Sequence, residues 1–159
     1  MMRVGTGYDV HRLKAGRKLV LGGVLVPSAQ GLDGHSDADV LLHAIIDALL
    51  GAAALGDIGQ HFPDTDLSYK DSDSRELLRR VAGLLNKKYF TVVNIDATIV
   101  AESPKLEPYI ADMRSRIAAD LNLDMDTVSV KATTSEGIGM IGRNEGMSAM
   151  ATCLIMKQE

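Results

Sequence analysis

The chain has 159 residues, a formal net charge of −4, and 46% hydrophobic and 24% charged residues. This composition is that of a soluble globular protein, and it excludes disordered and collagen-like chains. A chain of this length buries roughly 70% of the surface that its unfolded form exposes. We therefore expect one domain over residues 1–159, with no internal boundary.

The same numbers disfavour two kinds of partner. Four tyrosines, two phenylalanines and no tryptophan leave little for stacking nucleic-acid bases, and no dense basic run is present. No apolar stretch approaches the roughly 20 residues of a membrane span, and the first residues carry no secretory run. Cys153 is the only cysteine. The lack of an intrachain disulfide favours a reducing compartment.

The first half of the chain predicts short strands followed by helices. Arg3–His11 reads as a strand, and Lys18–Leu21 with Val24–Val26 reads as a hairpin closed by two glycines. Apolar residues recur at helical spacing over Asp39–Gly51, and a second helix is predicted over Asp73–Lys88.

The second half returns to strands with one helix among them. Apolar and polar residues alternate over Thr91–Ala101, with Val93 and Ile95 on the apolar face. A third helix is predicted over Glu107–Leu121, and further strands over Thr127–Ala132 and Met147–Met156.

This pattern indicates an α+β fold. Strands that alternate cleanly are covered on one face only, whereas strands covered on both faces read as continuous apolar runs. We therefore expect a mixed β-sheet with helices layered on one face. The polar sheet face, which bears Asn94, Asp96, Thr98, Ser129 and Lys131, then meets solvent or lines a wet subunit interface.

Three residues form a candidate metal site. Asp9 and His11 are two residues apart on a strand, so their side chains point to the same face. His43 interrupts an apolar helix, and Asp39 or Asp47, one turn away, could hold its second ring nitrogen as metal-bound histidines require. Together they resemble a catalytic zinc site with an open position. A surface strand pair and a buried core histidine are the alternatives.

The segment before that helix offers a cap and an anion contact. Ser36, three residues before Asp39, fits a capping box. His35 would sit just outside the helix N-terminus, where anions are favoured and a donor side chain could join in.

Two polar strand ends could cradle a nucleotide. Thr133–Gly137 offers hydroxyls, backbone N–H groups and a carboxylate, and Ala101–Leu106 adds Lys105. As isolated patterns, both read equally well as polar turns. The glycine run Gly137–Gly142 matches a dinucleotide fingerprint, but the chain after it is too short for the required helix and strand. We interpret it as a turn or bulge with Arg143 at its end.

Taken together, these residues resemble the 2-C-methyl-D-erythritol 2,4-cyclodiphosphate synthase family, the cyclising enzymes of the non-mevalonate isoprenoid route. The resemblance rests on ordered motifs that run nearly end to end, namely Gly7–His11, His35–Val40 with His43, Gly56–Gly59, Phe62–Asp66, Asp71–Leu77, Pro104-Lys105, Lys131–Thr134 with Glu136, and Gly142–Gly146.

The resemblance implies a homotrimer with active sites between subunits. It implies that 4-diphosphocytidyl-2-C-methyl-D-erythritol 2-phosphate is cyclised with release of CMP. By position, Asp9, His11 and His43 would hold Zn²⁺, and Glu136 would hold a Mg²⁺ or Mn²⁺ on the diphosphate. His35 and Thr134 would stabilise the transition state. A cytoplasmic location is implied, or the plastid stroma for a mature plant or algal chain.

The resemblance also implies two sets of substrate contacts. Residues that meet the ribose and the methylerythritol phosphate would be Asp9, Val10, His11, His35, Ser36, Asp57, Ile58, Gly59, Phe62, Pro63, Asp64, Thr65 and Asp66. Those of the cytidine diphosphate pocket would be Ala101, Glu102, Ser103, Pro104, Lys105, Leu106, Glu107, Thr133, Thr134, Ser135 and Glu136. Met140, where many relatives carry an aromatic residue, and Arg143 would face a cavity on the trimer axis.

Two other functions use the same residues. A metal-dependent phosphohydrolase would use the Asp9, His11 and His43 site to activate water. A trimeric binding module would use it without chemistry.

Overall fold

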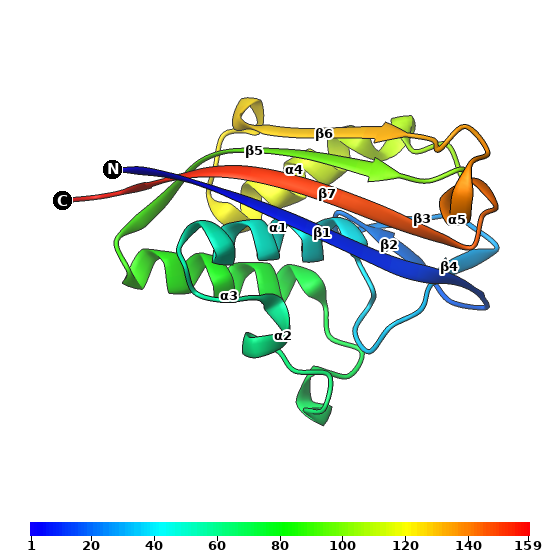
Figure 1. Ribbon diagram of the computed structural model, residues 1–159, viewed down its shortest axis with the longest axis horizontal. Helices are drawn as coiled ribbons and strands as arrows, with labels where there is room; N and C mark the ends of the chain where they lie inside the picture. Colours follow the sequence, from blue (N-terminus) through cyan, green and yellow to red (C-terminus); the bar gives the residue numbers. More distant parts are fainter.

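A five-stranded mixed sheet forms the frame of the computed structural model, which describes residues 1–159. The strand order is β4-β1-β7-β5-β6. The strands are β1 (Met2–Ala15), β4 (Gln30–Leu32), β7 (Gly146–Lys157), β5 (Phe90–Val100) and β6 (Val128–Thr133). β5 and β6 run parallel, and the other neighbours pair antiparallel. The termini lie side by side at one end (Figure 1), where Met2 pairs with Met156.

Three long helices cover one face of this sheet (Figure 1). They are α1 (Val40–Ala52), α3 (Ser74–Lys87) and α4 (Ile110–Leu121). α1 packs on β1 and β7, α3 packs outside α1, and α4 packs on β6. The predicted α+β fold, a mixed sheet with helices on one face, is confirmed.

The remaining elements are short. β2 (Leu19–Leu21) and β3 (Val24–Val26) form the predicted hairpin as a separate two-stranded sheet. α2 (Ile58–His61) and α5 (Gly139–Gly142) are single helical turns. Three 3₁₀ turns complete the chain, at Leu67–Tyr69, Glu107–Tyr109 and Met125–Thr127.

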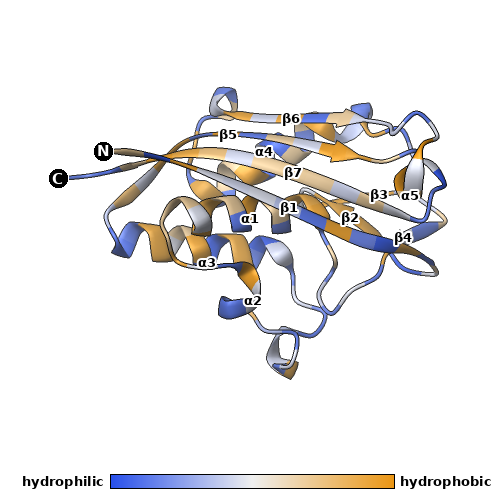
Figure 2. Cartoon of the chain, in the orientation of Figure 1, coloured by the Kyte–Doolittle hydropathy of each residue, from blue (hydrophilic) through white to orange (hydrophobic).

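α1 is buried on nearly every side because it lies between the sheet and α3. Every residue of this helix except Asp47 and Gly51 is buried. Figure 2 shows mainly hydrophobic colours along α1 and a mixture of both colours along α3. This is what distinguishes a central helix from a surface helix. None of the helices has the length and apolarity that a membrane crossing requires.

Close contact between β1 and α1 depends on two glycines. Gly5 and Gly7 face α1, and a Cβ at either position would overlap a carbonyl oxygen of the helix, that of Ala48 or Ala44. The glycines therefore let the strand lie directly on the helix backbone. Asp9 and His11 follow on the same face of β1. Because the strand lies so close to the helix backbone, both side chains can reach residues of α1.

The other face of the sheet has no helix over it and is only partly polar. On β5 and β6 it carries the expected polar residues, among them Lys131, whose Nζ lies 2.8 Å from Asp96 Oδ2. On β1 and β7, however, it exposes large hydrophobic side chains, including Val4 (65% exposed), Tyr8 (53%) and Met150 (51%). The expected polar residues thus occupy the β5 and β6 half of this face, and the β1 and β7 half, for which the sequence analysis makes no prediction, is apolar.

Local details also differ from the sequence prediction. The N-cap of α1 is Asp39, whose carboxylate accepts from Leu42 N at 3.1 Å, so the capping box at Ser36 is wrong. A β-bulge between Val92 and Asn94 breaks the predicted alternation in β5. The glycine run forms the short helix α5, with Gly139 in the left-handed region.

Candidate functional site

β1 and α1 bring the three predicted metal ligands together. Asp9 Oδ2 lies 2.9 Å from His11 Nε2 and 3.1 Å from His43 Nδ1. The two ring nitrogens are 3.3 Å apart. These three atoms form the one cluster of potential metal ligands in the structure.

Each imidazole also makes a hydrogen bond through its second ring nitrogen, the one that does not face Asp9. His11 Nδ1 lies 2.9 Å from the carbonyl oxygen of Asp33, to which only an N–H can donate. His43 Nε2 lies 2.9 Å from Ser74 Oγ. The predicted partners of His43 are wrong. Asp39 instead binds the amides of the hairpin turn at Gly22 and Gly23, and Asp47 accepts from Ile58 N at 2.8 Å.

The donor set fits a tetrahedral metal ion. Two ligand atoms bound to Zn²⁺ at its usual bond lengths are about 3.3 Å apart, close to the separations of the three atoms seen here. Carboxylate oxygens and imidazole nitrogens are both among the ligands that Zn²⁺ binds in proteins. Three corners of a tetrahedron are therefore provided, and the fourth opens into a cavity.

The electrostatics of the cluster favour an ionised carboxylate. Burial alone would raise the pKa of Asp9, but hydrogen bonds from His11 and His43 outweigh burial and lower it to about 2. Burial likewise opposes protonation of His11, yet the hydrogen bond to Asp9 and the carboxylate charge raise the pKa of His11 above its usual value. The cluster thus keeps a negative charge at its centre.

The cluster opens into a cavity of about 400 Å³, which we call the metal-site cavity. Its lining residues are Asp9, His11, Gly34, His35, Ser36, His43, Ile58, Gly59, Phe62, Asp64, Tyr69 and Leu77. Six of the predicted contacts beyond the three ligands lie here, namely His35, Ser36, Ile58, Gly59, Phe62 and Asp64; Gly34, Tyr69 and Leu77 were missed. Pro63, Thr65 and Asp66 belong to the neighbouring loop but do not line the cavity.

The loops around this cavity are tied by side chains. His35 Nε2 lies 3.2 Å from the Asp66 carbonyl oxygen, which it reaches as a donor. Asp57 caps α2, accepting from Gln60 N at 2.9 Å. Hydrogen bonds from Ser68 lower the pKa of exposed Asp66. Burial raises the pKa of Asp47, which holds the start of α2.

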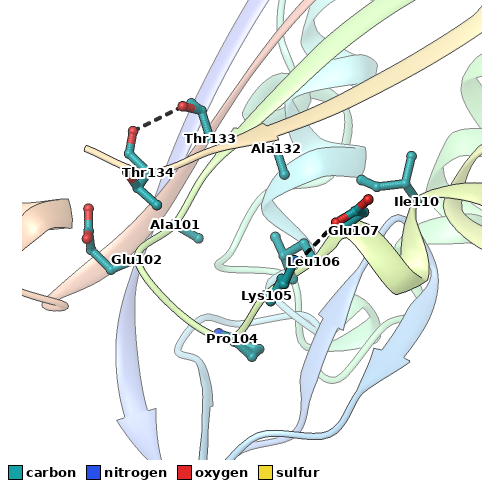
Figure 3. A pocket seen from close by; sticks show the side chains of 10 residues that line it. All are labelled: Ala101, Glu102, Pro104, Lys105, Leu106, Glu107, Ile110, Ala132, Thr133 and Thr134. Carbon is teal, nitrogen blue, oxygen red and sulfur yellow. Dashed lines mark hydrogen bonds and ion pairs between the residues drawn. The ribbon is translucent and has the colours of Figure 1, made fainter. Parts of the chain in front are cut away.

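A second cavity of about 400 Å³ lies where β5 and β6 end, and we call it the strand-end cavity. Figure 3 shows the side chains that surround it, namely Ala101, Glu102, Pro104, Lys105, Leu106, Glu107, Ile110, Ala132, Thr133 and Thr134. β5 and β6 are parallel and paired in register up to Val100 and Thr133. Their ends therefore meet at the same edge, as the sequence predicted for these two turns. Ile110 and Ala132 were missed.

Few charged groups in the strand-end cavity are fixed. Lys105 Nζ and Glu107 lie 3.2 Å apart, but their side chains are 80% and 79% exposed. Glu102 accepts from Ser135 N at 2.7 Å and so ties the two turns together. Glu136 is exposed in the turn beyond, with a left-handed backbone, and does not line the cavity.

The two cavities have no lining residue in common. His35 belongs to the metal-site cavity and Thr134 to the strand-end cavity. The structure therefore does not bring the two predicted transition-state groups into one cavity of a single chain. Val10 and Met140 lie together in a third, smaller cavity, and Arg143 pairs with Glu145 at 2.6 Å.

Known proteins share this sequence and this fold over nearly all of this chain. The profile of the YgbB family matches residues 2–156. A 2-C-methyl-D-erythritol 2,4-cyclodiphosphate synthase of Methylobacillus flagellatus is 62% identical over 159 residues, covering 100% of this chain and 99% of the relative. This chain belongs to the YgbB family of 2-C-methyl-D-erythritol 2,4-cyclodiphosphate synthases. It is an enzyme, a cyclising lyase of isoprenoid precursor synthesis.

Solved structures of the synthase family agree. The bifunctional IspDF from Campylobacter jejuni superposes with a TM-score of 0.96 at 43% identity, over 100% of this chain and 43% of that longer chain. IspF from Plasmodium falciparum, solved as a CDP complex, gives a TM-score of 0.87 at 32% identity, over 99% and 97% of the two chains. A synthase of this family thus binds CDP on the same fold.

Proposed function

We propose that the synthase reaction takes place where the metal-site cavity of one chain meets the strand-end cavity of a neighbouring copy. The observation that carries this proposal is the separation of the two cavities. His35 and Thr134 line different cavities of one chain, which supports a site to which one chain contributes His35 and its neighbour Thr134.

A homotrimer would bring these halves together and would cover the sheet. The face of β1 and β7 without helices exposes Val4, Tyr8 and Met150, and large exposed apolar patches usually mark interfaces. Head-to-tail contacts around a threefold axis close a ring with three equivalent boundaries. Each boundary would hold one active site.

The reaction itself requires alignment and charge neutralisation. An oxygen of the 2-phosphate attacks the β-phosphorus and forms a new P–O bond, while the bond from that phosphorus to the bridging oxygen breaks. The electron pair of the broken bond leaves with CMP. Because the attacking phosphate is already anionic, no general base is needed, and positioning with charge stabilisation provides most of the catalysis.

Residues of the metal-site cavity would hold the methylerythritol phosphate end. Asp9, His11 and His43 would bind Zn²⁺, which supplies positive charge for the phosphate oxygens when bound. His35 and Ser36 would contact the methylerythritol phosphate, and His35 would stabilise the transition state. The loop Phe62–Asp66 would contact the sugar, and Asp57 to Gly59 the ribose.

Residues of the strand-end cavity would hold the cytidine diphosphate. The turns Ala101–Glu107 and Thr133–Ser135 surround a cavity large enough for a nucleotide base, and Thr134 would stabilise the transition state. Glu136, at the rim, would hold Mg²⁺ or Mn²⁺ on the diphosphate. Val10, Met140 and Arg143 would lie toward the trimer axis.

We treat residues 1–159 as one synthase domain, since 39 buried residues form a single core. Free, buried Cys153 suits a cytoplasmic location.

The test follows the diphosphocytidyl substrate in oxygen-18 water. Cyclic product and CMP without label are expected, because no water enters the reaction. Labelled phosphate would instead show a phosphohydrolase that uses the same metal cluster. Unchanged substrate under metal-loaded conditions would leave only a binding module.

A further inference from the structure

A hydroxyl and a carboxylate lie behind His43, on the side away from the metal-site cavity. His43 Nε2 is 2.9 Å from the hydroxyl oxygen of Ser74, a residue with 0% exposure. Ser74 donates to Asp37 Oδ1 at 2.5 Å, and its backbone N–H donates to Asp37 Oδ2 at 2.9 Å. Ser74 is thus held on two sides at the first turn of α3.

The hydrogen bonds that link His43 to Ser74 and Ser74 to Asp37 allow only one order of donors and acceptors. A carboxylate accepts and does not donate, so the single hydroxyl proton of Ser74 points to Asp37. The lone pairs of the Ser74 oxygen then face His43, and a stable 2.9 Å contact requires a proton on Nε2. A neutral imidazole with its proton on Nε2 presents a free lone pair on Nδ1. Nδ1 is the atom that faces Asp9 and the metal position.

Without Ser74 the opposite arrangement becomes available. Ser36 Oγ also approaches His43 Nε2, at 3.3 Å, and its proton is free to point toward that nitrogen. His43 could then carry its proton on Nδ1 and donate it to Asp9 Oδ2, 3.1 Å away. In that state the ligand atom is blocked by a proton.

We propose that Ser74, oriented by Asp37, is a positioning residue that holds His43 in the tautomer able to bind the metal. This inference rests on the proposed metal role of Asp9, His11 and His43. The same contacts link the metal ligand to the segment of His35. Asp71 N donates to the His35 carbonyl at 2.8 Å, and Asp37 N donates to the Ser72 carbonyl at 3.1 Å. Residues 71–74, at the start of α3, therefore hold the segment of His35 and Asp37 through several hydrogen bonds.

The first experiment measures Zn²⁺ affinity by chelator competition in Ser74→Ala. Loss of a partner that orients a metal-bound histidine typically weakens metal binding roughly ten- to a hundredfold. We expect a loss near the lower end, because the Ser36 hydroxyl can accept from Nε2 as well as donate to it, and so keeps part of the population in the metal-binding tautomer. Activity of the variant should recover as Zn²⁺ is raised, which a general folding defect would not allow.

The matched control is Asp73→Ala. Asp73 caps the same helix by accepting from Arg75 N at 2.9 Å, and it is exposed. This variant weakens the start of α3 without touching His43, so its Zn²⁺ affinity should equal that of the wild type. Equal losses in both variants would show that Ser74 acts only by supporting α3, and would overturn the proposal.

The second experiment does not depend on any Ser74 variant folding. In protein labelled with nitrogen-15 at its four histidines, we expect His43 to carry its proton on Nε2 both before and after Zn²⁺ is added. A metal-free protein in which His43 carries its only proton on Nδ1 would overturn the proposal. A third variant, His43→Ala, distinguishes failure of the metal site from failure of the role of Ser74. Unchanged Zn²⁺ binding in His43→Ala would contradict the metal site itself. Loss of Zn²⁺ in His43→Ala without any loss in Ser74→Ala would contradict only the role of Ser74.

Discussion

The metal-site cavity and the strand-end cavity differ in how their polar groups are held. His11 and His43 each have one ring nitrogen bound to a fixed acceptor and the other aimed at Asp9. Lys105 and Glu107, by contrast, pair with each other in the open, at 80% and 79% exposure. The first cavity is organised before any ligand arrives, and the second offers backbone turns that a ligand and a neighbouring chain would complete.

This difference follows from where the residues lie in the fold. The metal ligands stand on a long strand and on the most buried helix, whose backbones are in contact through Gly5 and Gly7. The strand-end cavity is built from two turns at the edge of the sheet, where the chain is exposed. A strand and a buried helix can hold metal ligands in a fixed geometry. The two exposed turns suit a charged ligand such as a nucleoside diphosphate.

The largest effect should come from breaking the metal-site cavity at its centre. His43→Ala removes one ligand of the proposed metal ion, so one tightly held ion per chain should be lost. Because the metal supplies several kcal/mol of charge stabilisation, kcat/KM should fall by roughly a thousandfold or more. Metal analysis beside a melting curve checks this. A lower melting temperature with unchanged metal content would instead mark His43 as a plain core residue.

The support behind the metal cluster can be broken without touching a ligand. In Gly7→Ala, the new methyl group would overlap the Ala44 carbonyl oxygen and push β1 away from α1. We expect a loss of up to about 3 kcal/mol in the free energy of unfolding, together with weaker Zn²⁺ binding. Urea unfolding and chelator competition measure the two effects.

Gly83→Ala is the control for that substitution. Gly83 lies inside α3 with open space around its Cβ position, so alanine should stabilise the helix by about 0.5–1 kcal/mol. If both glycine variants behave alike, close packing of β1 on α1 is not what positions Asp9 and His11.

Acid should weaken the metal-free protein through the same cluster. The pKa of Asp9 is lowered from 3.8 to about 2 in the folded chain. A lowered pKa means that the stabilisation is present above the unfolded value and is lost as the pH falls from about 4 toward 2. The loss attributable to Asp9 is about 2 kcal/mol. Urea unfolding of wild type and Asp9→Asn across this range should converge at low pH; a constant difference would contradict the assignment.

The proposed Mg²⁺ contact of Glu136, just beyond the lining of the strand-end cavity, should affect CDP affinity independently of the metal cluster. Glu136→Gln removes the charge proposed to hold Mg²⁺ on the diphosphate, so Mg²⁺-dependent CDP binding should weaken about tenfold. Calorimetry with and without Mg²⁺ measures this loss. Zinc content should stay at the wild-type level, and its fall in this variant would show that the two cavities are not separate.

Much of the metal-site cavity was readable in the sequence because it follows local periodicity. Asp9 and His11 are one strand repeat apart, and His43 is the polar exception on an apolar helix. Toward the N-terminus the same alternation places Gly7 and Gly5 on this face of β1. Two glycines on one face of a strand indicate that another backbone, here that of α1, packs closely against it. The sequence prediction assigns glycine a role only in turns and therefore does not predict this contact.

What could not be read depends on contacts between distant segments. Ser74 lies 31 residues from His43 and 37 from Asp37, and no local pattern pairs them. A carboxylate one turn along the helix was the local choice, but Asp39 was already engaged in capping and in holding the hairpin turn. The apolar half of the open sheet face was missed for a similar reason, since it combines side chains of β1 and β7 from the two ends of the chain.

The most direct test of a site divided between neighbouring chains is complementation. His43→Ala and Glu136→Ala, each inactive alone, are unfolded together and refolded as a mixture, and mass spectrometry confirms mixed trimers. About a quarter of the boundaries then pair an intact metal-site cavity with an intact strand-end cavity. We expect activity to recover to about a quarter of the wild-type level. Mixed trimers that remain inactive would place each site within a single chain and contradict it.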